Sequence, residues 1–375
     1  MLCKAPFLGL TIDPSGAIVL CCATKDRDYL KTNINDVESL NDFFLGSEYQ
    51  HVRDTMIKDG IHGLQQCKGC WKATEGYAAE IDNYNSKTPS EPLTIKYLEV
   101  TTSNVCNQTC VMCSSYFSSK WRKLEAQFNR HAFPSFYLND SAVDKILEVL
   151  PTLEYLQIKG GEPFADKNNL KILKTLSQVN PTCEVIITSN FQTLSREWLD
   201  VLKMLPNIRA YASIDGVYRV YDWIRGGNFE ETTSNMELFY NETGKKLVVN
   251  PCISVYNLLH FHEIKNYFKD KDYVENVINN NIVEYPEYLS PSLLPSSAIS
   301  KATFIQKTSI PEFKTTYEVD DNLTKIRSWY SSESEKDPEE IVELRKQFRA
   351  HTEQMNKVRG FNIFDLEPEL MPIFK

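Results

Sequence analysis

The sequence has no long apolar run, no excess of positive charge and no export leader at its start. None of its hydrophobic stretches approaches the roughly 20 residues that a membrane-spanning helix needs. The opening Met-Leu-Cys-Lys-Ala-Pro-Phe lacks a charged segment followed by a hydrophobic one, which argues against a secretion signal. A net charge of −9 argues against general binding of nucleic-acid phosphates, because such proteins usually present a basic face. We therefore expect a cytoplasmic protein without a membrane or nucleic-acid partner.

Cysteine, in contrast, is plentiful, with ten among 375 residues. In a chain that is not secreted, cysteines at such spacings suggest metal ligands before disulfides. They gather mainly near the N-terminus and around residue 110, and the last is Cys252. The chain is also long enough for one sizeable core and a smaller domain. We therefore expect two metal sites in two parts of the fold.

The middle group follows the apolar run 95–102 and consists of Cys106, Cys110 and Cys113, spaced C-x3-C-x2-C. Three thiolates so close in sequence can converge on one soft metal centre. Three protein ligands complete neither a four-iron cluster nor a tetrahedral zinc, and no further cysteine or histidine follows before His131. The spacing therefore predicts a metal with an open position, as in catalytic sites.

The N-terminal group consists of Cys3, Cys21, Cys22, Cys67 and Cys70. Residues 8–20 read as a β-hairpin around the turn Asp-Pro-Ser-Gly, which would place Cys3 before its first strand and Cys21 after its second. Together with Cys67-Lys-Gly-Cys70 these two thiols would complete a four-ligand site. Cys22 is expected to be a packed bystander, although exchange with Cys21 stays open. Ligand counting alone leaves iron–sulfur and zinc as equal alternatives.

From residue 93 onward, short β-rich runs alternate with amphipathic helices. Strands are expected at 95–102, 154–159, 183–189, 208–214, 246–255 and 274–283. Such βα units with nearly continuous apolar strands imply a parallel sheet covered by helices, and six units are too few for a closed eight-unit barrel. We expect an α/β fold with an N-terminal cysteine-rich α+β domain (1–92), a partial (β/α)6 barrel (93–295) and a helical C-terminal extension (296–375). A helix in that extension should begin at Asp337-Pro338.

Polar or glycine-rich clusters follow four of the expected strands. They are the cysteine trio, Gly160-Gly161-Glu162-Pro163, Ser189-Asn190 and Ser213-Ile-Asp215-Gly216. The carboxyl ends of parallel strands meet at one edge, where ligands bind. Loops after strands are often polar, and that explanation suffices for Ser189-Asn190 alone. Four coinciding clusters, one of them a metal trio, favour a functional site.

On these motifs the sequence resembles the radical S-adenosylmethionine (SAM) enzymes. The cysteine trio after one strand, with Gly-Gly-Glu-Pro after the next, matches their signature. The resemblance implies that Cys106, Cys110 and Cys113 hold a [4Fe–4S] cluster whose fourth iron binds SAM. It also implies an electron donor such as flavodoxin or ferredoxin, and reductive cleavage of SAM to a 5′-deoxyadenosyl radical that abstracts a hydrogen atom from a substrate.

The resemblance also assigns SAM-binding residues, which are Gly160, Gly161, Glu162, Pro163, Ser189, Asn190, Ser213, Asp215 and Arg225. The fork of Arg225 suits the carboxylate at the methionine end of SAM. Met112 departs from the family, in which many members carry an aromatic residue before the third cysteine. Cys183 and Cys252 fall inside expected strands and are interpreted as core thiols.

The N-terminal cysteines resemble the twitch (half-SPASM) module, which carries one auxiliary iron–sulfur cluster. This favours a second [4Fe–4S] cluster on Cys3, Cys21, Cys67 and Cys70 over zinc, although the module usually follows the barrel and here precedes it.

Relatives of this kind often modify peptides, and others act on nucleotides or small sugars. We therefore place a peptide or protein substrate first, and a small metabolite, nucleotide or RNA second. A zinc-stapled, non-catalytic binding protein is the alternative of another class. No catalytic acid or base is assigned, and Asp215 and Asp222 are candidates by position only.

Overall fold

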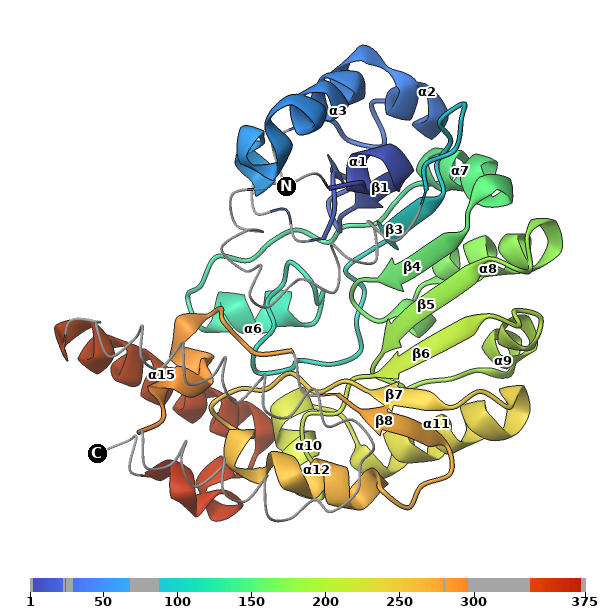
Figure 1. The fold of residues 1–375 in the computed structure, drawn as a ribbon. Coiled ribbons are helices and arrows are strands. Elements are labelled where there is room, and N and C mark those ends of the chain that lie inside the picture. The colour runs from blue at the N-terminus through green and yellow to red at the C-terminus, as the bar shows by residue number, and fades with distance from the viewer. Residues whose placement is uncertain are drawn as a thin grey trace.

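The computed structural model describes residues 3–22, 24, 30–67, 88–278, 281–295 and 338–371. Its centre is one eight-stranded sheet in the order β2-β1-β3-β4-β5-β6-β7-β8 (Figure 1). The strands are β1 (Gly9–Ile12), β2 (Ile18–Val19), β3 (Tyr97–Thr101), β4 (Tyr155–Lys159), β5 (Glu184–Ser189), β6 (Ile208–Ala212), β7 (Leu247–Val249) and β8 (Val274–Val277). All neighbouring pairs are parallel except β1 and β2. The expected open, mostly parallel barrel is confirmed.

Helices between successive strands cover one face of the sheet. They are α7 (Asp140–Val149), α8 (Lys167–Val179), α9 (Arg196–Lys203), α10 (Tyr218–Arg225), α11 (Phe229–Thr243) and α12 (Phe261–Phe268). Side chains alternate between the two faces of a strand, and Leu98, Leu156 and Val185 belong to one buried core with Ile146 of α7 and Leu173 of α8. Burial of this apolar face explains why the strands read as hydrophobic runs.

The opposite face of the sheet is polar and partly accessible. It presents Tyr97, Glu99, Tyr155, Gln157, Lys159, Arg209 and Tyr211 at the alternate positions of β3, β4 and β6. The rings of Tyr97 and Tyr155 stack with centroids 4.8 Å apart, and Lys159 Nζ lies 3.2 Å from a carboxylate oxygen of Glu99. This face leads directly to the rim where the strands end.

The predicted N-terminal hairpin is present, and it joins the barrel instead of standing apart from it. Strand β1 pairs in parallel with β3, so closely that a Cβ on Gly9 would lie 1.8 Å from the carbonyl oxygen of Tyr97. At the hairpin turn, the Tyr116 hydroxyl donates to Asp13 Oδ2 at 2.7 Å. Because Tyr116 follows Cys113 by three residues, this bond links the hairpin to the cysteine loop.

Three N-terminal helices flank the hairpin: α1 (Ala5–Leu8), α2 (Leu40–Leu45) and α3 (Ser47–Asp59). Helix α3 is anchored by polar bonds to the segment that leads into β1. Tyr49 donates from its hydroxyl to the carbonyl of Gly9 at 2.7 Å, and Arg53 Nε donates to the carbonyl of Pro6 at 2.9 Å. Both side chains are buried, so these bonds fix α3 against the hairpin.

In the described part of the C-terminal region, α15 (Pro338–Arg359) begins where the sequence predicts it. It lies on the side toward which the barrel strands point, near α6 (Trp121–Gln127), and is drawn in red in Figure 1. The side chains of Phe348 and Met355 are buried on the inner side of α15. The hydroxyl groups of Thr352 and Tyr256 form a hydrogen bond 2.8 Å long.

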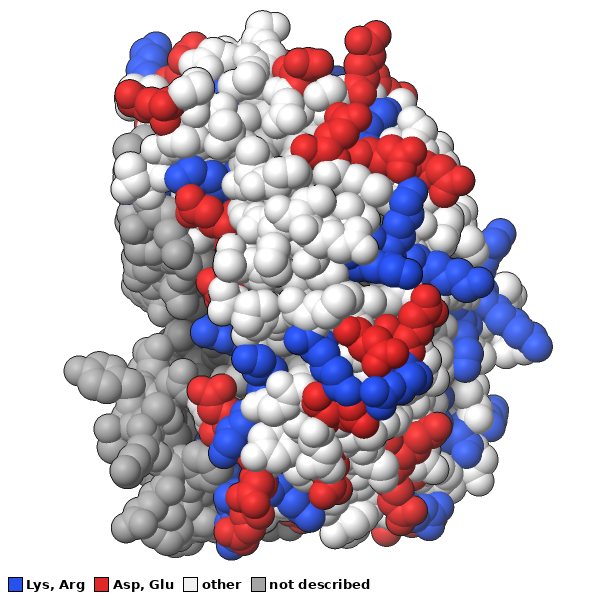
Figure 2. Space-filling model, turned by 90° about the vertical axis from the view of Figure 1, so that its right-hand side faces the viewer, with Lys and Arg blue, Asp and Glu red and all other residues white. Residues whose placement is uncertain are grey.

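None of the described helices combines the length and apolarity needed to cross a lipid bilayer. On the face shown in Figure 2, basic and acidic side chains stand in small neighbouring groups of both signs.

Candidate active site at the carboxyl rim of the barrel

The cysteine trio lies on the loop that follows β3. Cys110 is buried, and Cys106 and Cys113 are half-buried. The backbone turns at the last two cysteines, with the N–H of Cys113 donating to the carbonyl of Cys110 at 2.9 Å. Ser118 Oγ donates to the carbonyl of Gln108 at 2.8 Å and ties the outgoing chain back to the loop. The trio thus occupies the rim position that the strand prediction gave it.

The three thiols lie close enough to influence one another electrostatically. Burial raises the pKa of Cys106 to about 12, and the negative charge of Cys110 contributes to this rise. Burial, followed by the charges of Cys110 and Cys106, raises the pKa of Cys113 well above its ordinary value. Within the described residues, however, no three Cys, His, Asp or Glu side chains stand ready-made to hold an ion. Three mutually close sulfur donors fit a soft, positively charged centre, and ligation by the trio stays a prediction.

Gly160 and Gly161 let the loop after β4 run against the chain that enters the cysteine loop. A Cβ on Gly161 would lie 2.1 Å from the carbonyl oxygen of Val105, and Gly160 has a φ of +137°, which favours glycine. The N–H of Glu162 donates to the same Val105 carbonyl at 2.8 Å. Both glycines therefore let the backbone approach the residues before Cys106 closely.

The buried carboxylate of Glu162 binds two of the other predicted residues, Ser189 and Asn190. It accepts hydrogen bonds from Ser189 Oγ at 2.7 Å and from the N–H of Asn190 at 2.7 Å. Burial raises the pKa of Glu162, although these bonds act in the opposite direction. Asn190 Nδ2 also donates to Asn107 Oδ1 at 2.7 Å, which ties this group to the cysteine loop. The N–H of Ser213 donates to the carbonyl of Ser189 at 2.9 Å, so all three rim loops are in contact.

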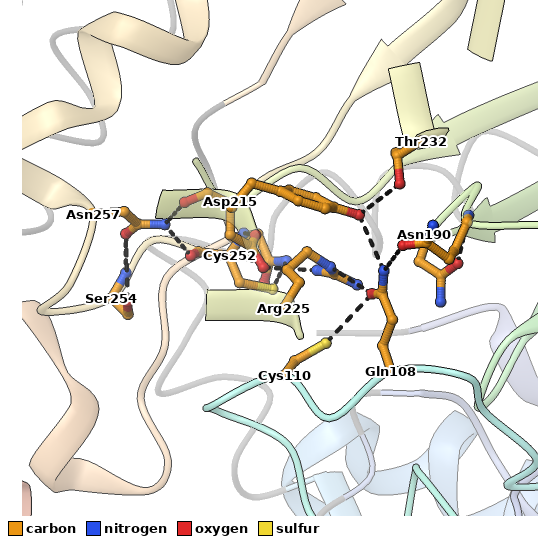
Figure 3. A network of polar contacts seen from close by, with 12 residues as sticks. Gln108, Cys110, Asn190, Asp215, Arg225, Thr232, Cys252, Ser254 and Asn257 are labelled. Atoms are coloured by element: carbon orange, nitrogen blue, oxygen red, sulfur yellow. Dashed lines mark hydrogen bonds and ion pairs between the residues drawn. The ribbon is translucent and has the colours of Figure 1, made fainter. Parts of the chain in front are cut away.

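Asp215 and Arg225 form a buried ion pair 2.7 Å long, drawn in Figure 3. Arg225 Nε also donates to Gln108 Oε1 at 3.1 Å. Burial favours a low pKa for Arg225, but the negative charges of Cys110 and Asp215 outweigh it and hold the pKa well above its ordinary value. Part of the guanidinium fork therefore binds the protein's own carboxylate, and its assignment to SAM stays a prediction.

Two residues at this site were not predicted from the sequence. Gln108, between the first two cysteines, is buried and donates from Nε2 to the Tyr221 hydroxyl at 3.1 Å while accepting from Arg225. Its only signal in the sequence was its place inside the trio. Cys252 was expected inside a strand, and that was wrong, because β7 ends at Val249. Its half-buried side chain does pack against the core. Its N–H donates to Asp215 Oδ1 at 2.6 Å (Figure 3).

Cys183, also predicted as a core thiol, is indeed buried just before β5. Asn250, which follows β7, has a buried Oδ1 with no hydrogen-bond partner in the described part of the chain. A buried acceptor without a donor is costly, so this oxygen offers a position for an N–H group of a ligand.

Three of the N-terminal thiols influence the phenol of Tyr49 electrostatically. Burial raises the pKa of this phenol, Arg53 opposes the rise, and the negative charges of Cys21, Cys3 and Cys67 add to it. Three of the four predicted auxiliary ligands thus lie within electrostatic reach of one hydroxyl, as one shared site requires. The fourth, Cys70, lies outside the described residues.

Two family models match the chain. That of the radical SAM superfamily matches residues 100–267, which include the trio and every predicted SAM-binding residue. That of SPASM, an iron–sulfur cluster-binding domain, matches residues 3–71, which include the N-terminal cysteines. No curated protein matches the chain.

Solved structures give distant matches. The structure of anSMEcpe with bound AdoMet is 16% identical, with a TM-score of 0.41, over 55% of this chain and 58% of that one. SuiB of Streptococcus suis bound to S-adenosylmethionine is 14% identical, with a TM-score of 0.38, over 74% of this chain and 53% of that one. The chain therefore spans somewhat more than half the length of these proteins.

Proposed function

We propose that this chain is a radical SAM enzyme with an auxiliary iron–sulfur domain and that it abstracts a hydrogen atom from a peptide or protein substrate. The matches of the radical SAM superfamily model to residues 100–267 and of the SPASM model to residues 3–71 support this. The radical SAM match implies SAM and a [4Fe–4S] cluster, and the SPASM match implies an auxiliary iron–sulfur cluster. When bound, SAM and the first cluster supply the 5′-deoxyadenosyl radical. One observation supports the proposal most strongly: the trio, the Gly160 loop and the Asp215–Arg225 pair meet at one rim.

The residues at that rim have different roles. Cys106, Cys110 and Cys113 would hold the cluster. Glu162 fixes Ser189 and Asn190 through hydrogen bonds to its carboxylate, so the SAM-facing edge is ordered before any ligand arrives.

On the other side, Gln108 connects the trio to Arg225, which is itself fixed by Asp215. A guanidinium held in this way can present its remaining N–H groups to a carboxylate without losing side-chain entropy on binding. The unpaired Oδ1 of Asn250 adds a hydrogen-bond acceptor to the same rim.

We place the substrate over the polar face of the sheet. Lys159 precedes Gly160 directly and pairs with Glu99, and the half-buried ring of Tyr155, which stacks on Tyr97, adds an aromatic group to the same face. Such a mixture suits amide groups and charged termini, which a peptide has in abundance. Relatives with a SPASM-type domain often modify peptides, and this supports the choice of a peptide before a small metabolite.

The first experiment asks whether SAM is cleaved at the trio. Anaerobically reconstituted protein is mixed with dithionite and SAM, and 5′-deoxyadenosine is measured. Cys110→Ala should abolish its formation, whereas Cys183→Ala, which removes a thiol far from the rim, should not. Activity that survives Cys110→Ala would contradict the assignment. Colourless protein that binds zinc instead of iron would favour the non-catalytic alternative.

The second experiment identifies the substrate class. The enzyme is incubated with unlabelled SAM and deuterated host extract, separated into peptide and small-molecule fractions. Hydrogen abstraction moves deuterium from the substrate into 5′-deoxyadenosine, which mass spectrometry detects. We expect deuterium from the peptide fraction. Deuterium that comes only from the small-molecule fraction would overturn the peptide proposal and leave the radical chemistry intact.

A further inference from the structure

Three consecutive carbonyl groups around Cys110 accept hydrogen bonds from side chains outside the cysteine loop. Arg359 Nη2 donates to the carbonyl of Thr109 at 2.5 Å, Trp121 Nε1 to that of Cys110 at 2.9 Å, and His351 Nε2 to that of Val111 at 2.9 Å. His351 and Arg359 both lie on α15, more than 230 residues further along the chain. One helix therefore holds the loop on both sides of its buried cysteine.

Each nitrogen of the Arg359 guanidinium donates a hydrogen bond. Besides the bond to the Thr109 carbonyl, Nη1 donates to Thr109 Oγ1 at 2.8 Å and Nε donates to the carbonyl of Trp223 at 2.7 Å. Gly226, which is left-handed with a φ of +66°, makes room for it, because a Cβ there would lie 2.8 Å from three guanidinium atoms. This gives the Arg-Gly-Gly stretch after Ile224 a structural reason that does not involve SAM.

His351 acts as a neutral donor in this arrangement. Its Nδ1 accepts from Arg130 Nη2 at 3.2 Å, which leaves the proton on the nitrogen that faces Val111. Burial, reinforced by the nearby Arg130, lowers the pKa of His351 to about 3, so the ring carries no charge at neutral pH. Its ring also stacks on Trp121, with centroids 6.2 Å apart, so two of the three donors support each other.

Arg359 brings a positive charge close to Cys110. Burial lowers the pKa of Arg359 to about 10, partly offset by the Cys110 thiolate, and the side chain is therefore still charged at neutral pH. A cluster bound through this thiolate gains negative charge on reduction, and a buried cation beside it favours that state.

We propose that α15 is part of the cluster site: His351 and Arg359 are positioning residues that shape the cysteine loop, and the charge of Arg359 raises the reduction potential of the cluster at Cys110. The proposal rests on the proposed function, because it needs a cluster on the trio. No bond is made or broken in it; one electron enters the cluster from the external donor.

The role of the Arg359 charge is tested in the full-length reconstituted protein. A redox titration monitored by electron paramagnetic resonance gives the midpoint potential of the SAM-responsive cluster. Arg359→Gln should lower the potential by about 59 mV, which is a tenfold change for one electron. Arg359→Lys keeps the charge and should stay close to the unmodified protein. Lys357→Gln removes a charge from an exposed position of the same helix and should change nothing.

The role of the His351 hydrogen bond is tested by measuring the iron bound per chain. His351→Phe keeps a ring against Trp121 but removes the donor to Val111, and should lower the iron held at the trio. His351→Gln restores an N–H donor and should recover most of it. Apo-protein melting temperatures for all variants show whether a loss of iron reflects general unfolding. Arg359→Met, which also removes the charge, replaces Arg359→Gln if that variant does not fold.

The outcomes separate the two proposals. Unmodified protein that forms no SAM-responsive cluster overturns the proposed function and this inference with it. A normal cluster whose potential is the same in the protein and in Arg359→Gln overturns the electrostatic role alone. Equal shifts in Arg359→Lys and Arg359→Gln also contradict it, because only one of them removes the charge. Equal iron in His351→Phe and the unmodified protein overturns the positioning role.

Discussion

The guanidinium of Arg225 lies 2.7 Å from the carboxylate of Asp215, and the same carboxylate accepts the backbone N–H of Cys252. Asp215 is completely buried and Arg225 nearly so. The pair therefore holds two rim loops together in a place that water does not reach, and each charge depends on the other for compensation.

Removing one member of this pair should be costly. Asp215→Ala leaves Arg225 buried without its carboxylate, and we expect the free energy of unfolding to fall by about 3–5 kcal/mol. Urea unfolding followed by circular dichroism measures this. Asp272→Ala, at an exposed position, should change stability little. A loss below about 1 kcal/mol in Asp215→Ala would show that water reaches the pair.

The glycine loop offers a test of how the trio is positioned. Gly161→Ala puts a methyl group 2.1 Å from the Val105 carbonyl, so the chain entering Cys106 must move, and the iron bound at the trio should decrease. Gly244→Ala is the matched control. It strains a left-handed glycine with open space around it, at a cost of about 1 kcal/mol, far from the cysteine loop. Equal iron in both variants would contradict the prediction.

Two separate clusters predict a simple iron count. The triple variant of Cys106, Cys110 and Cys113 to Ala should keep about four irons per chain, because the N-terminal cysteines still hold the auxiliary cluster. It should form no 5′-deoxyadenosine. Zinc at the N-terminal site, found by metal analysis of the same sample, would refute the auxiliary cluster while leaving the trio assignment intact.

The stability of the C-terminal region should depend on pH through His260. Burial lowers its pKa, but hydrogen bonds and charges from Glu263 and Glu367 outweigh it and raise the pKa to about 9. A histidine whose folded pKa is raised stabilises the fold fully below about pH 6.5, and this contribution is lost as the pH rises through about 9. The free energy of unfolding should therefore fall over that window. His260→Gln should flatten the fall, and His51→Gln, at an exposed site, should not.

Much of the fold could be predicted from local patterns. The six strands of the barrel, the N-terminal hairpin and the start of α15 at Pro338 all follow from alternation, turn residues and helix-start signals. The rim site followed because parallel strands end at one edge. Each of these signals is contained within a few neighbouring residues.

What could not be predicted depends on contacts between distant residues. The parallel pairing of β1 with β3 joins segments some 90 residues apart, and no local pattern specifies it. Cys252 looked like part of a strand because apolar residues surround it, but its N–H donates to Asp215 instead of to a neighbouring strand. The contacts from α15 to the cysteine loop involve backbone carbonyls, which carry no sequence signal at all.

The pairing of β1 with β3 makes the two cysteine regions parts of one rigid body. The strand that precedes the trio is bonded along its length to the strand that lies between Cys3 and Cys21, and the Tyr116–Asp13 bond closes the connection at the rim. Among the described residues, the register of a β-ladder therefore sets the separation of Cys3 and Cys21 from the trio. If each region holds a cluster, this ladder would fix the distance that an electron crosses between them.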